Sequence, residues 1–344
     1  MNMHPYTTVA VEQLMKLVNI PSPTGFTHMA AEYLMDVLTG YGFEPYRTHK
    51  GNVVCCIGGE GHPMVVAAHV DTLGAMVRSI KPNGRLRFTE IGGYPANNVE
   101  NETCVVHTRD GRTYTGTFYI TTPASHVYPG ITEMKRDDNT SEVVLDENVS
   151  SKEDVRKLGI EVGDFISLDP RAVNTPSGYI KSRHLDDKAS AAVLLALAKM
   201  VSEDSIKLSR KIYLLFTVHE EVGHGCASGH PDDVEDILSV DMGCVGDDLG
   251  CDETMVSICA KDSRGPYNYE MTGKLIQLAK DNDIKYAVDV YPMYSSDADV
   301  ALTSGHDFRH ALIGPGVFAS HGYERTHVSG IDATLKLLVA FVTD

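Results

Sequence analysis

The feature that most restricts the fold is an apolar run at residues 211–218 that ends abruptly in His219, Glu220 and Glu221. We interpret the run as a buried strand. Two adjacent carboxylates at the end of such a strand are unfavourable beside a core unless a positive group meets them. A bound metal ion would supply that charge, and a solvated turn after a strand is the plain alternative.

The two histidines near this acidic pair do not form the helical zinc motif of metalloproteases. That motif needs two histidines four residues apart on one helix face, whereas His219 and His224 are five apart. Five residues correspond to about 500° of helix rotation, so the two rings would diverge by roughly 140°. The pattern instead favours a strand-end pair, in which one glutamate binds metal and its neighbour is a general base.

Composition excludes several classes of partner. The net charge of −17 argues against nucleic acid or an anionic membrane as a partner. No apolar run approaches the length of a transmembrane helix, and the first 25 residues lack the pattern of a secretion signal. Seven cysteines without a CxxC spacing indicate a reducing compartment rather than a disulfide scaffold. We therefore expect a cytoplasmic protein.

The pattern of predicted secondary structure changes at two places in the chain, near residues 73 and 183. Residues 7–40 are predicted to form two helical segments, and residues 52–57 and 64–68 two short strands. The next part has short alternating stretches and a single helical turn, at 151–158, which is typical of a small β domain. The predicted division is a catalytic α/β domain made of residues 1–72 and 183–344, with an inserted β domain at residues 73–182.

An alternation of strands and helices returns after residue 183. Strands are predicted at 211–218, 238–241, 254–260, 285–291 and 309–314, and helices at 190–201, 267–282, 297–304 and 329–343. Such alternation predicts a mostly parallel sheet covered by helices on both faces. The predicted fold class is therefore α/β, with a mostly parallel sheet between helices and an inserted small β-barrel.

Carboxylates and imidazoles follow several of these predicted strands. In open α/β sheets, ligands bind beyond the carboxyl ends of the strands. Five separate segments bring such groups there, namely His69 with Asp71, Asp186 with Asp187, Glu220 with Glu221, Asp241, and His321. The set suits two divalent metals that share one carboxylate. Imidazole and carboxylate ligands fit zinc, cobalt or manganese, and zinc is the ion we expect.

The chain resembles the dinuclear metallo-aminopeptidases of the glutamyl-aminopeptidase and tetrahedral (TET) aminopeptidase family. The motifs that carry the resemblance, in order, are HxD at 69–71, LDDK at 185–188, HEEVG at 219–223 and VDMG at 240–243, together with SSKEDVRKLGIEVGD at 150–164. The resemblance covers nearly the whole chain. It implies a zinc-exopeptidase-like sheet domain, an aminopeptidase activity on short peptides, and a homo-oligomer, often a twelve-subunit tetrahedral shell assembled partly through the inserted domain.

The resemblance also implies a role for each site residue. His69, Asp186 and Asp241 would hold one metal ion, and Asp186, Glu221 and His321 the other, with Asp186 bridging. Glu220 would be the general base for a water held between the ions. Asp71 would accept a hydrogen bond from His69 and so fix its tautomer. The Asp186–Asp187 peptide bond would be cis.

Some assignments stay open in the sequence. The last ligand is either His321, which we favour from its spacing to the final helix and from Glu324 after it, or His327. Asp297 and Asp299 could support the metal site or cap a helix. At Thr72 the chain departs from the acidic or other polar residue that relatives often carry.

Two other functions would use the same ligands. A related dinuclear carboxypeptidase or deacylase would hold the substrate carboxylate through an arginine, for which Arg264 and Arg309 are candidates. A metal-binding homologue without activity is the second alternative, and the intact pair of Glu220 and Glu221 argues against it. We expect small peptides as substrates and no nucleic acid or membrane partner.

Overall fold

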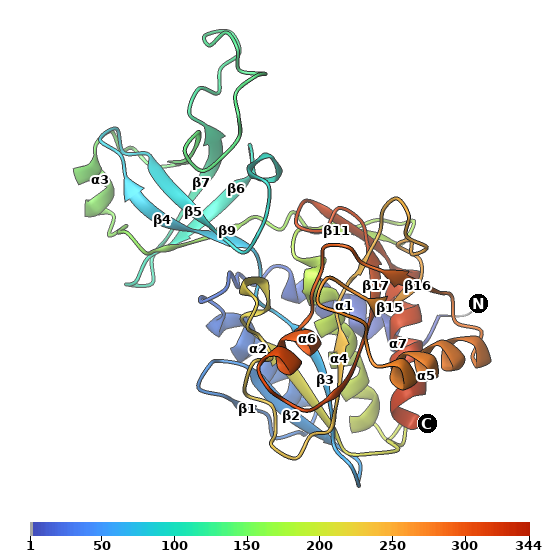
Figure 1. Ribbon diagram of the computed structural model, residues 1–344. Helices are drawn as coiled ribbons and strands as arrows, with labels where there is room; N and C mark the ends of the chain where they lie inside the picture. The colour runs from blue at the N-terminus through green and yellow to red at the C-terminus, as the bar shows by residue number, and fades with distance from the viewer. Residues whose placement is uncertain (1–2) are drawn as a thin grey trace.

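A nine-stranded sheet between helices forms the larger part of the molecule, and a six-stranded closed barrel lies to one side of it (Figure 1). The computed structural model describes residues 3–344. The sheet has the order β1-β2-β12-β3-β13-β17-β15-β16, with the short β14 paired to β17. Its strands are β1 (Tyr46–Arg47), β2 (Val53–Gly58), β3 (Met64–His69), β12 (Ile212–Thr217), β13 (Asp236–Val240), β14 (Gly243–Cys244), β15 (Val256–Lys261), β16 (Tyr286–Val290) and β17 (Arg309–Val317).

The centre of the sheet is parallel. Strands β12, β3, β13 and β17 run parallel to one another. The pairs β1–β2, β2–β12 and β15–β17 are antiparallel. Every residue of β3 and β13 is buried, as expected for central parallel strands with both faces covered. The strands predicted at 64–68 and 238–241 correspond to β3 and β13.

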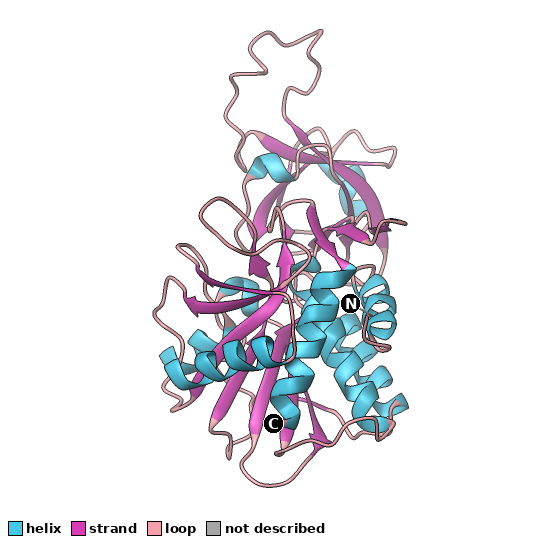
Figure 2. Cartoon of the chain, turned by 90° about the vertical axis from the view of Figure 1, so that its right-hand side faces the viewer, coloured by secondary structure: helices cyan, strands magenta, loops and turns pink. Residues whose placement is uncertain are grey.

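Helices cover both faces of this sheet (Figure 2). Alternate strand residues point to opposite faces, so Val66 packs in the cluster of the large helices and Val65 in the cluster beneath α6. The helices are α1 (Thr7–Leu17), α2 (His28–Gly40), α4 (Leu185–Ser202), α5 (Tyr269–Asp281), α6 (Asp297–Thr303) and α7 (Val328–Thr343). The Ala- and Leu-rich α4 is buried along almost its whole length.

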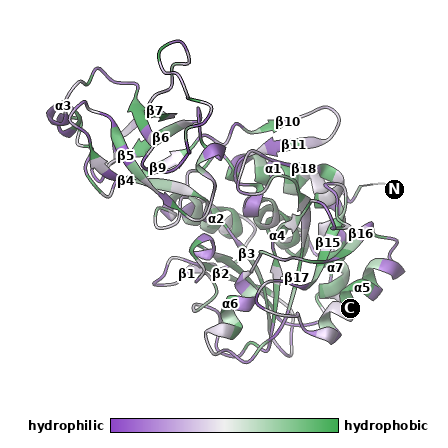
Figure 3. Ribbon diagram, turned by 45° about the horizontal axis from the view of Figure 1, so that its top comes forward, coloured by the Kyte–Doolittle hydropathy of each residue, from purple (hydrophilic) through white to green (hydrophobic). Residues whose placement is uncertain are grey.

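The barrel closes in the order β4-β5-β8-β7-β6-β9 around its own apolar core. It contains β4 (Gly74–Ile80), β5 (Leu86–Ile91), β6 (Thr103–His107), β7 (Thr113–Ile120), β8 (Ser141–Leu145) and β9 (Phe165–Leu168), with η1 (Ala96–Asn98) and α3 (Lys152–Lys157) between them. Figure 3 shows hydrophobic residues in the barrel strands, as a separate core requires. The sequence did not predict β4 or β8.

A third, small sheet joins the end of the barrel segment to the start of α7. It consists of β10 (Val173–Asn174), β11 (Tyr179–Ser182) and β18 (Glu324–His327), all antiparallel. The predicted fold class is confirmed, because a mostly parallel sheet with helices carries an inserted closed barrel. The domain boundaries at 72/73 and 182/183 stay a prediction. Within residues 3–344, no helix is both long and apolar enough to cross a membrane.

Candidate metal centre

The predicted site residues meet at one edge of the large sheet. Strands β12, β3 and β13 are parallel neighbours, so their carboxyl ends lie together. The end of β3 carries His69, the turn after β12 carries Glu220 and Glu221, and Asp241 follows β13 directly. From the segment after β17, His321 reaches the same place.

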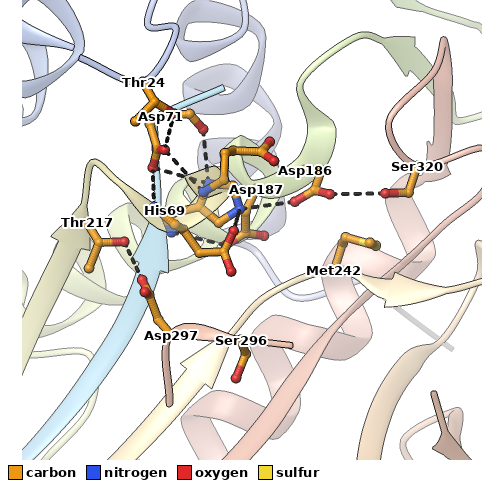
Figure 4. Close-up of polar contacts among 12 residues, drawn as sticks. Thr24, His69, Asp71, Asp186, Asp187, Thr217, Met242, Ser296, Asp297 and Ser320 are labelled. Carbon is orange, nitrogen blue, oxygen red and sulfur yellow. Dashed lines mark hydrogen bonds and ion pairs between the residues drawn. The ribbon is translucent and has the colours of Figure 1, made fainter. Parts of the chain in front are cut away.

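Asp186 lies between two histidines from distant parts of the chain. Its Oδ1 is 3.1 Å from Nε2 of His69, and its Oδ2 is 3.4 Å from Nε2 of His321. The hydroxyl of Ser320 donates a further hydrogen bond to Oδ2, at 3.0 Å, and Figure 4 shows Asp186 between His69 and Ser320. A carboxylate that presents one oxygen to each imidazole is placed to serve two ions at once.

Two groups of side chains could each hold a cation. Ligand atoms of His69, Asp186 and Glu221 all lie within 4.8 Å of one another, and so do those of His69, Asp187 and Asp241. Asp187 is therefore a site residue to which the sequence analysis gave no role. The sequence analysis assigned the neighbouring Asp186 of the LDDK motif as a ligand. The motif therefore pointed to this position, but the sequence alone does not distinguish the roles of the two aspartates.

The peptide bond between Asp186 and Asp187 is cis, as the resemblance implied. Both side chains are buried. Oδ2 of Asp187 accepts a hydrogen bond from the backbone N–H of His69, at 3.3 Å. Its Oδ1 is buried and has no hydrogen-bond partner within residues 3–344. An unpaired buried carboxylate oxygen is unfavourable, and a cation would satisfy it.

Burial raises the pKa of several carboxyl groups in this cluster. It raises the pKa of Glu221 to about 8 and that of Asp241 to about 7, and it raises the pKa of Glu220 well above its ordinary value. Although burial opposes it, hydrogen bonds from His321 and His69 hold the pKa of Asp186 below its usual range. So many buried acids with two imidazoles form a donor set that fits divalent zinc, cobalt or manganese.

The carboxylate of Asp71 holds the turn that carries the two glutamates. It accepts hydrogen bonds from the backbone N–H groups of Glu220, at 3.1 Å, and Glu221, at 3.3 Å, and from the hydroxyl of Thr24, at 2.7 Å. The hydrogen bond predicted from His69 runs to the backbone carbonyl of Asp71, at 3.0 Å, while the carboxylate Oδ1 lies 3.7 Å away. The carboxylate is occupied by the turn, so the carbonyl orients the ring.

A second aspartate anchors the far side of the same turn. The carboxylate of Asp297, at the start of α6, accepts a hydrogen bond from the backbone N–H of Cys226, at 2.7 Å, and one from the hydroxyl of Thr217. A Cβ atom on Gly225 would lie 2.2 Å from Oδ1 of Asp297, so this close approach requires glycine. Asp299 instead belongs to the capping box of α6.

His321 lies in the site and His327 lies outside it. Nε2 of His321 is 3.6 Å from Glu221, and Glu324 accepts hydrogen bonds from the backbone N–H groups of both His321 and Asp186, each at 3.1 Å. His327 contacts the backbone carbonyl of Ser177, at 3.0 Å, in the small sheet. Of the two histidines that the sequence left open, the structure brings only His321 to the acidic cluster.

A cavity of about 510 Å³ opens onto these side chains. Asp186, Glu220, Glu221, Asp241 and His321 line it. Neither arginine that the sequence analysis considered is among its described lining residues. Arg309 forms an ion pair with Asp236 at the amino ends of β17 and β13, which is the other edge of the sheet.

Known proteins that are similar to this chain include several named as aminopeptidases. The family model described as M42 glutamyl aminopeptidase matches residues 51–337. A relative from Bacillus subtilis (strain 168), named "Putative aminopeptidase YhfE", is 45% identical over 334 residues, covering 96% of each chain. The lysyl aminopeptidase of Pyrococcus furiosus is 24% identical over 213 residues, covering 62% of this chain and 60% of its own length.

Solved structures share the fold. The TET aminopeptidase from the marine sediment archaeon Thaumarchaeota archaeon SCGC AB-539-E09 superposes with a TM-score of 0.87 at 19% identity, covering 97% of this chain and 96% of its own. The TET1 peptidase of Pyrococcus horikoshii, described as able to assemble into a tetrahedron or a large octahedral shell, gives 0.85 at 21% identity, covering 97% and 99%.

Proposed function

Because the chain belongs to the M42 glutamyl aminopeptidase family and is therefore a metal-dependent aminopeptidase, we propose that it uses two divalent ions per subunit to remove N-terminal residues from short peptides. The observation that carries this proposal is the position of Asp186 between His69 and His321. A single carboxylate between two imidazoles, with further acids on each side, supports a shared ligand for a pair of ions.

Five side chains would hold the two ions. His69 and Asp241 would bind the first ion, Glu221 and His321 would bind the second, and Asp186 would bind both. Asp187 is close enough to His69 and Asp241 to join or support the first group. When bound, such ions act as Lewis acids that lower the pKa of a water molecule and polarise the scissile carbonyl. Zinc is our first choice, with cobalt or manganese as alternatives.

Glu220 is the proposed general base. Its Oε2 is 3.8 Å from Nε2 of His69, and its side chain lines the cavity. Its carboxylate would take a proton from the attacking water, whose oxygen forms the new bond to the carbonyl carbon. The same carboxyl would then give that proton to the leaving amine as the C–N bond breaks. Asp71 would act by holding the backbone of Glu220 in place.

The related carboxypeptidase or deacylase function finds less support. Such an enzyme needs a cation for the substrate carboxylate, and no Lys or Arg occurs among the described residues that line the cavity. The inactive-homologue alternative is opposed by the presence of both Glu220 and Glu221 at the site.

We also propose that this cytoplasmic protein forms a homo-oligomer through the barrel, as a twelve-subunit tetrahedral shell. Two structural neighbours, one described as a dodecamer and one as able to assemble into a tetrahedron or a large octahedral shell, support the oligomeric assembly. Light scattering on the purified protein tests it, and a clean monomer would count against it.

A substrate panel tests the proposed function. The protein, loaded with zinc or cobalt and analysed for metal content, is offered peptides with a free N-terminus and the same peptides with a blocked N-terminus. We expect two ions per subunit and cleavage of the free-amine peptides alone. Faster cleavage of the blocked peptides would replace the aminopeptidase mechanism with a deacylase or carboxypeptidase one.

A further inference from the structure

The cavity beside the metal-binding residues has an apolar wall. Besides the acids and His321, its larger lining side chains are those of Met242, Cys244, Met293, Tyr294 and Pro95. Met242 follows Asp241 directly in the chain and Cys244 lies two positions further on, so both continue from the proposed ligand along the cavity. Figure 4 shows Met242 in the same view as Asp186 and Ser320, which line the cavity with it.

Two segments build this wall, and they are tied together. The hydroxyl of Tyr294 donates a hydrogen bond to the backbone carbonyl of Met242, at 3.2 Å. Met242 is 3% exposed, whereas Met293 is 91% exposed. The wall therefore runs from a buried position next to Asp241 out to the solvent, along a path that a substrate side chain could follow.

The charges around this cavity leave no partner for a charged side chain. No Lys or Arg is found among its described lining residues, and the one imidazole among them, that of His321, is already assigned to a metal ion. An acidic side chain would therefore lie beside four carboxylates with no free cationic side chain to pair with. The carboxylates that line it are those of Asp186, Glu220, Glu221 and Asp241, and the proposed mechanism already uses all four. A basic side chain could pair with one of them only by competing with a metal ion or with the base.

We infer that the enzyme selects peptides with an uncharged, apolar N-terminal residue of about the size of Leu or Met, over those that begin with Asp, Glu, Lys or Arg. The inference rests on the proposed function, because it takes the metal-binding residues as the place of the scissile bond. An apolar side chain gains from leaving water at this wall. Thioether side chains adapt to differently shaped partners, so the preference covers the apolar class rather than one residue.

The family name does not decide this preference. Relatives of the chain include one named lysyl aminopeptidase and one named glutamyl aminopeptidase, each 24% identical. The selectivity of this chain must therefore come from its own lining residues.

Aminoacyl-p-nitroanilides of Leu, Met, Ala, Glu and Lys test the inference on the metal-loaded protein. We expect kcat/KM for Leu and Met to exceed that for Glu and Lys by at least about tenfold. A value for Glu or Lys equal to or above that for Leu would overturn the inference. It would leave the aminopeptidase function standing, because a free-amine substrate would still be cleaved.

A binding measurement distinguishes failure of the proposed function from failure of the inferred substrate preference. Calorimetry on the metal-loaded Glu220→Gln variant compares leucinamide with lysinamide and with glutamic acid 1-amide. If the wild type cleaves nothing but the variant binds leucinamide most tightly, the proposed function fails and the preference stands. If leucinamide binds no more tightly than the charged amides, the preference fails whatever the catalytic result.

A charge placed at the mouth of the wall provides a direct test of its location. Met293→Lys should raise the ratio of Glu to Leu hydrolysis by about fivefold, because the new ammonium would attract the acidic side chain. The matched control is Val290→Lys, since Val290 is also exposed, at 54%, and lies three positions earlier but does not line the cavity. An equal change in the ratio of Glu to Leu hydrolysis in both variants would show that Met293 does not contact the substrate side chain.

Discussion

Nδ1 of His321 donates a hydrogen bond to the backbone carbonyl of Gly93, which lies 228 positions earlier in the chain. A carbonyl oxygen only accepts, so the proton must sit on Nδ1. With Nδ1 as the donor to Gly93, Nε2 faces Asp186 and Glu221 and is the ring nitrogen that a metal ion would bind. Gly93 lies between β5 and η1. The barrel segment thus fixes the proton position on a proposed metal ligand that belongs to the sheet.

Asn98 extends this link and provides the first prediction. Its side-chain amide donates a hydrogen bond to the backbone carbonyl of His321, at 3.0 Å. Asn98→Ala should lower the affinity of the weaker ion by about tenfold, as expected when a group that orients a ligand is lost. Calorimetric titration with zinc measures this. Asn97→Ala is the control, because Asn97 is exposed and its side chain makes no hydrogen bond within residues 3–344. Equal affinities in both variants would contradict the link.

Metal content should report the shared role of Asp186. Asp186→Ala should lose both ions, because it removes a ligand from each. His321→Ala should lose one, and His327→Ala, as the matched control, should keep both, since His327 contacts Ser177 in the small sheet. Elemental analysis of dialysed protein gives the count. Full metal content in Asp186→Ala would sink the bridging role.

Glu220→Gln should separate binding from chemistry. The amide keeps the shape of the side chain but cannot accept a proton, so kcat should fall by a factor on the order of 10²–10⁴. Metal content should stay unchanged. Glu235→Gln serves as the control, because Glu235 pairs with His62 on the surface, away from the site. A near-normal kcat in Glu220→Gln would remove it as the base.

The close contact at Gly225 should make an added methyl group destabilising. Gly225→Ala would place Cβ against the carboxylate of Asp297, which holds the turn after β12. We expect a loss of about 1–3 kcal/mol in the free energy of unfolding, together with reduced kcat. Denaturant unfolding measures the first. Gly246→Ala is the control, since a Cβ there meets no atom within 4 Å. Equal stability of the two variants would show that the turn after β12 can move to accommodate the added methyl group.

His107 should make the protein less stable in acid. Burial, and to a smaller extent His28, lowers the pKa of His107 from 6.5 to about 4. Between these two values the unfolded chain binds a proton that the folded protein does not, so stability falls as the pH drops from about 6.5 to about 4. Melting temperatures at pH 7 and pH 5 should differ less in His107→Gln than in the wild type. His126→Gln, at an exposed barrel position, should behave like the wild type.

Local periodicity made most of the fold predictable. Unbroken apolar residues predicted the strand at 64–68 and the helix at 190–201. These segments correspond to β3 and α4. The barrel was harder to resolve. Strand β8 begins at Ser141, directly after a charged loop, and its pairing with β7 involves residues more than 20 positions away. Pairing between strands so far apart in the chain is only weakly reflected in the residue pattern of either strand.

The candidate site divides in the same way. His69, Glu221 and Asp241 follow directly from strands, so the rule for carboxyl ends of parallel strands was enough to gather them. The partner of His69 could not be read in this way, because Asp71 offers both a carbonyl and a carboxylate, and only the turn with Glu220 decides which is free. The sequence analysis gave Asp187 no role because the sequence does not show which of the two adjacent aspartates faces which group.

By itself the sequence determined the alternation of elements, the strand ends that carry acids and imidazoles, and so the kind of chemistry. These follow from interactions between residues near one another in the chain, where spacing fixes geometry. The tertiary structure alone decided that His321 rather than His327 enters the cluster, and that Gly93 and Asn98 orient it. Those contacts depend on where the barrel lies against the sheet, which no local pattern encodes.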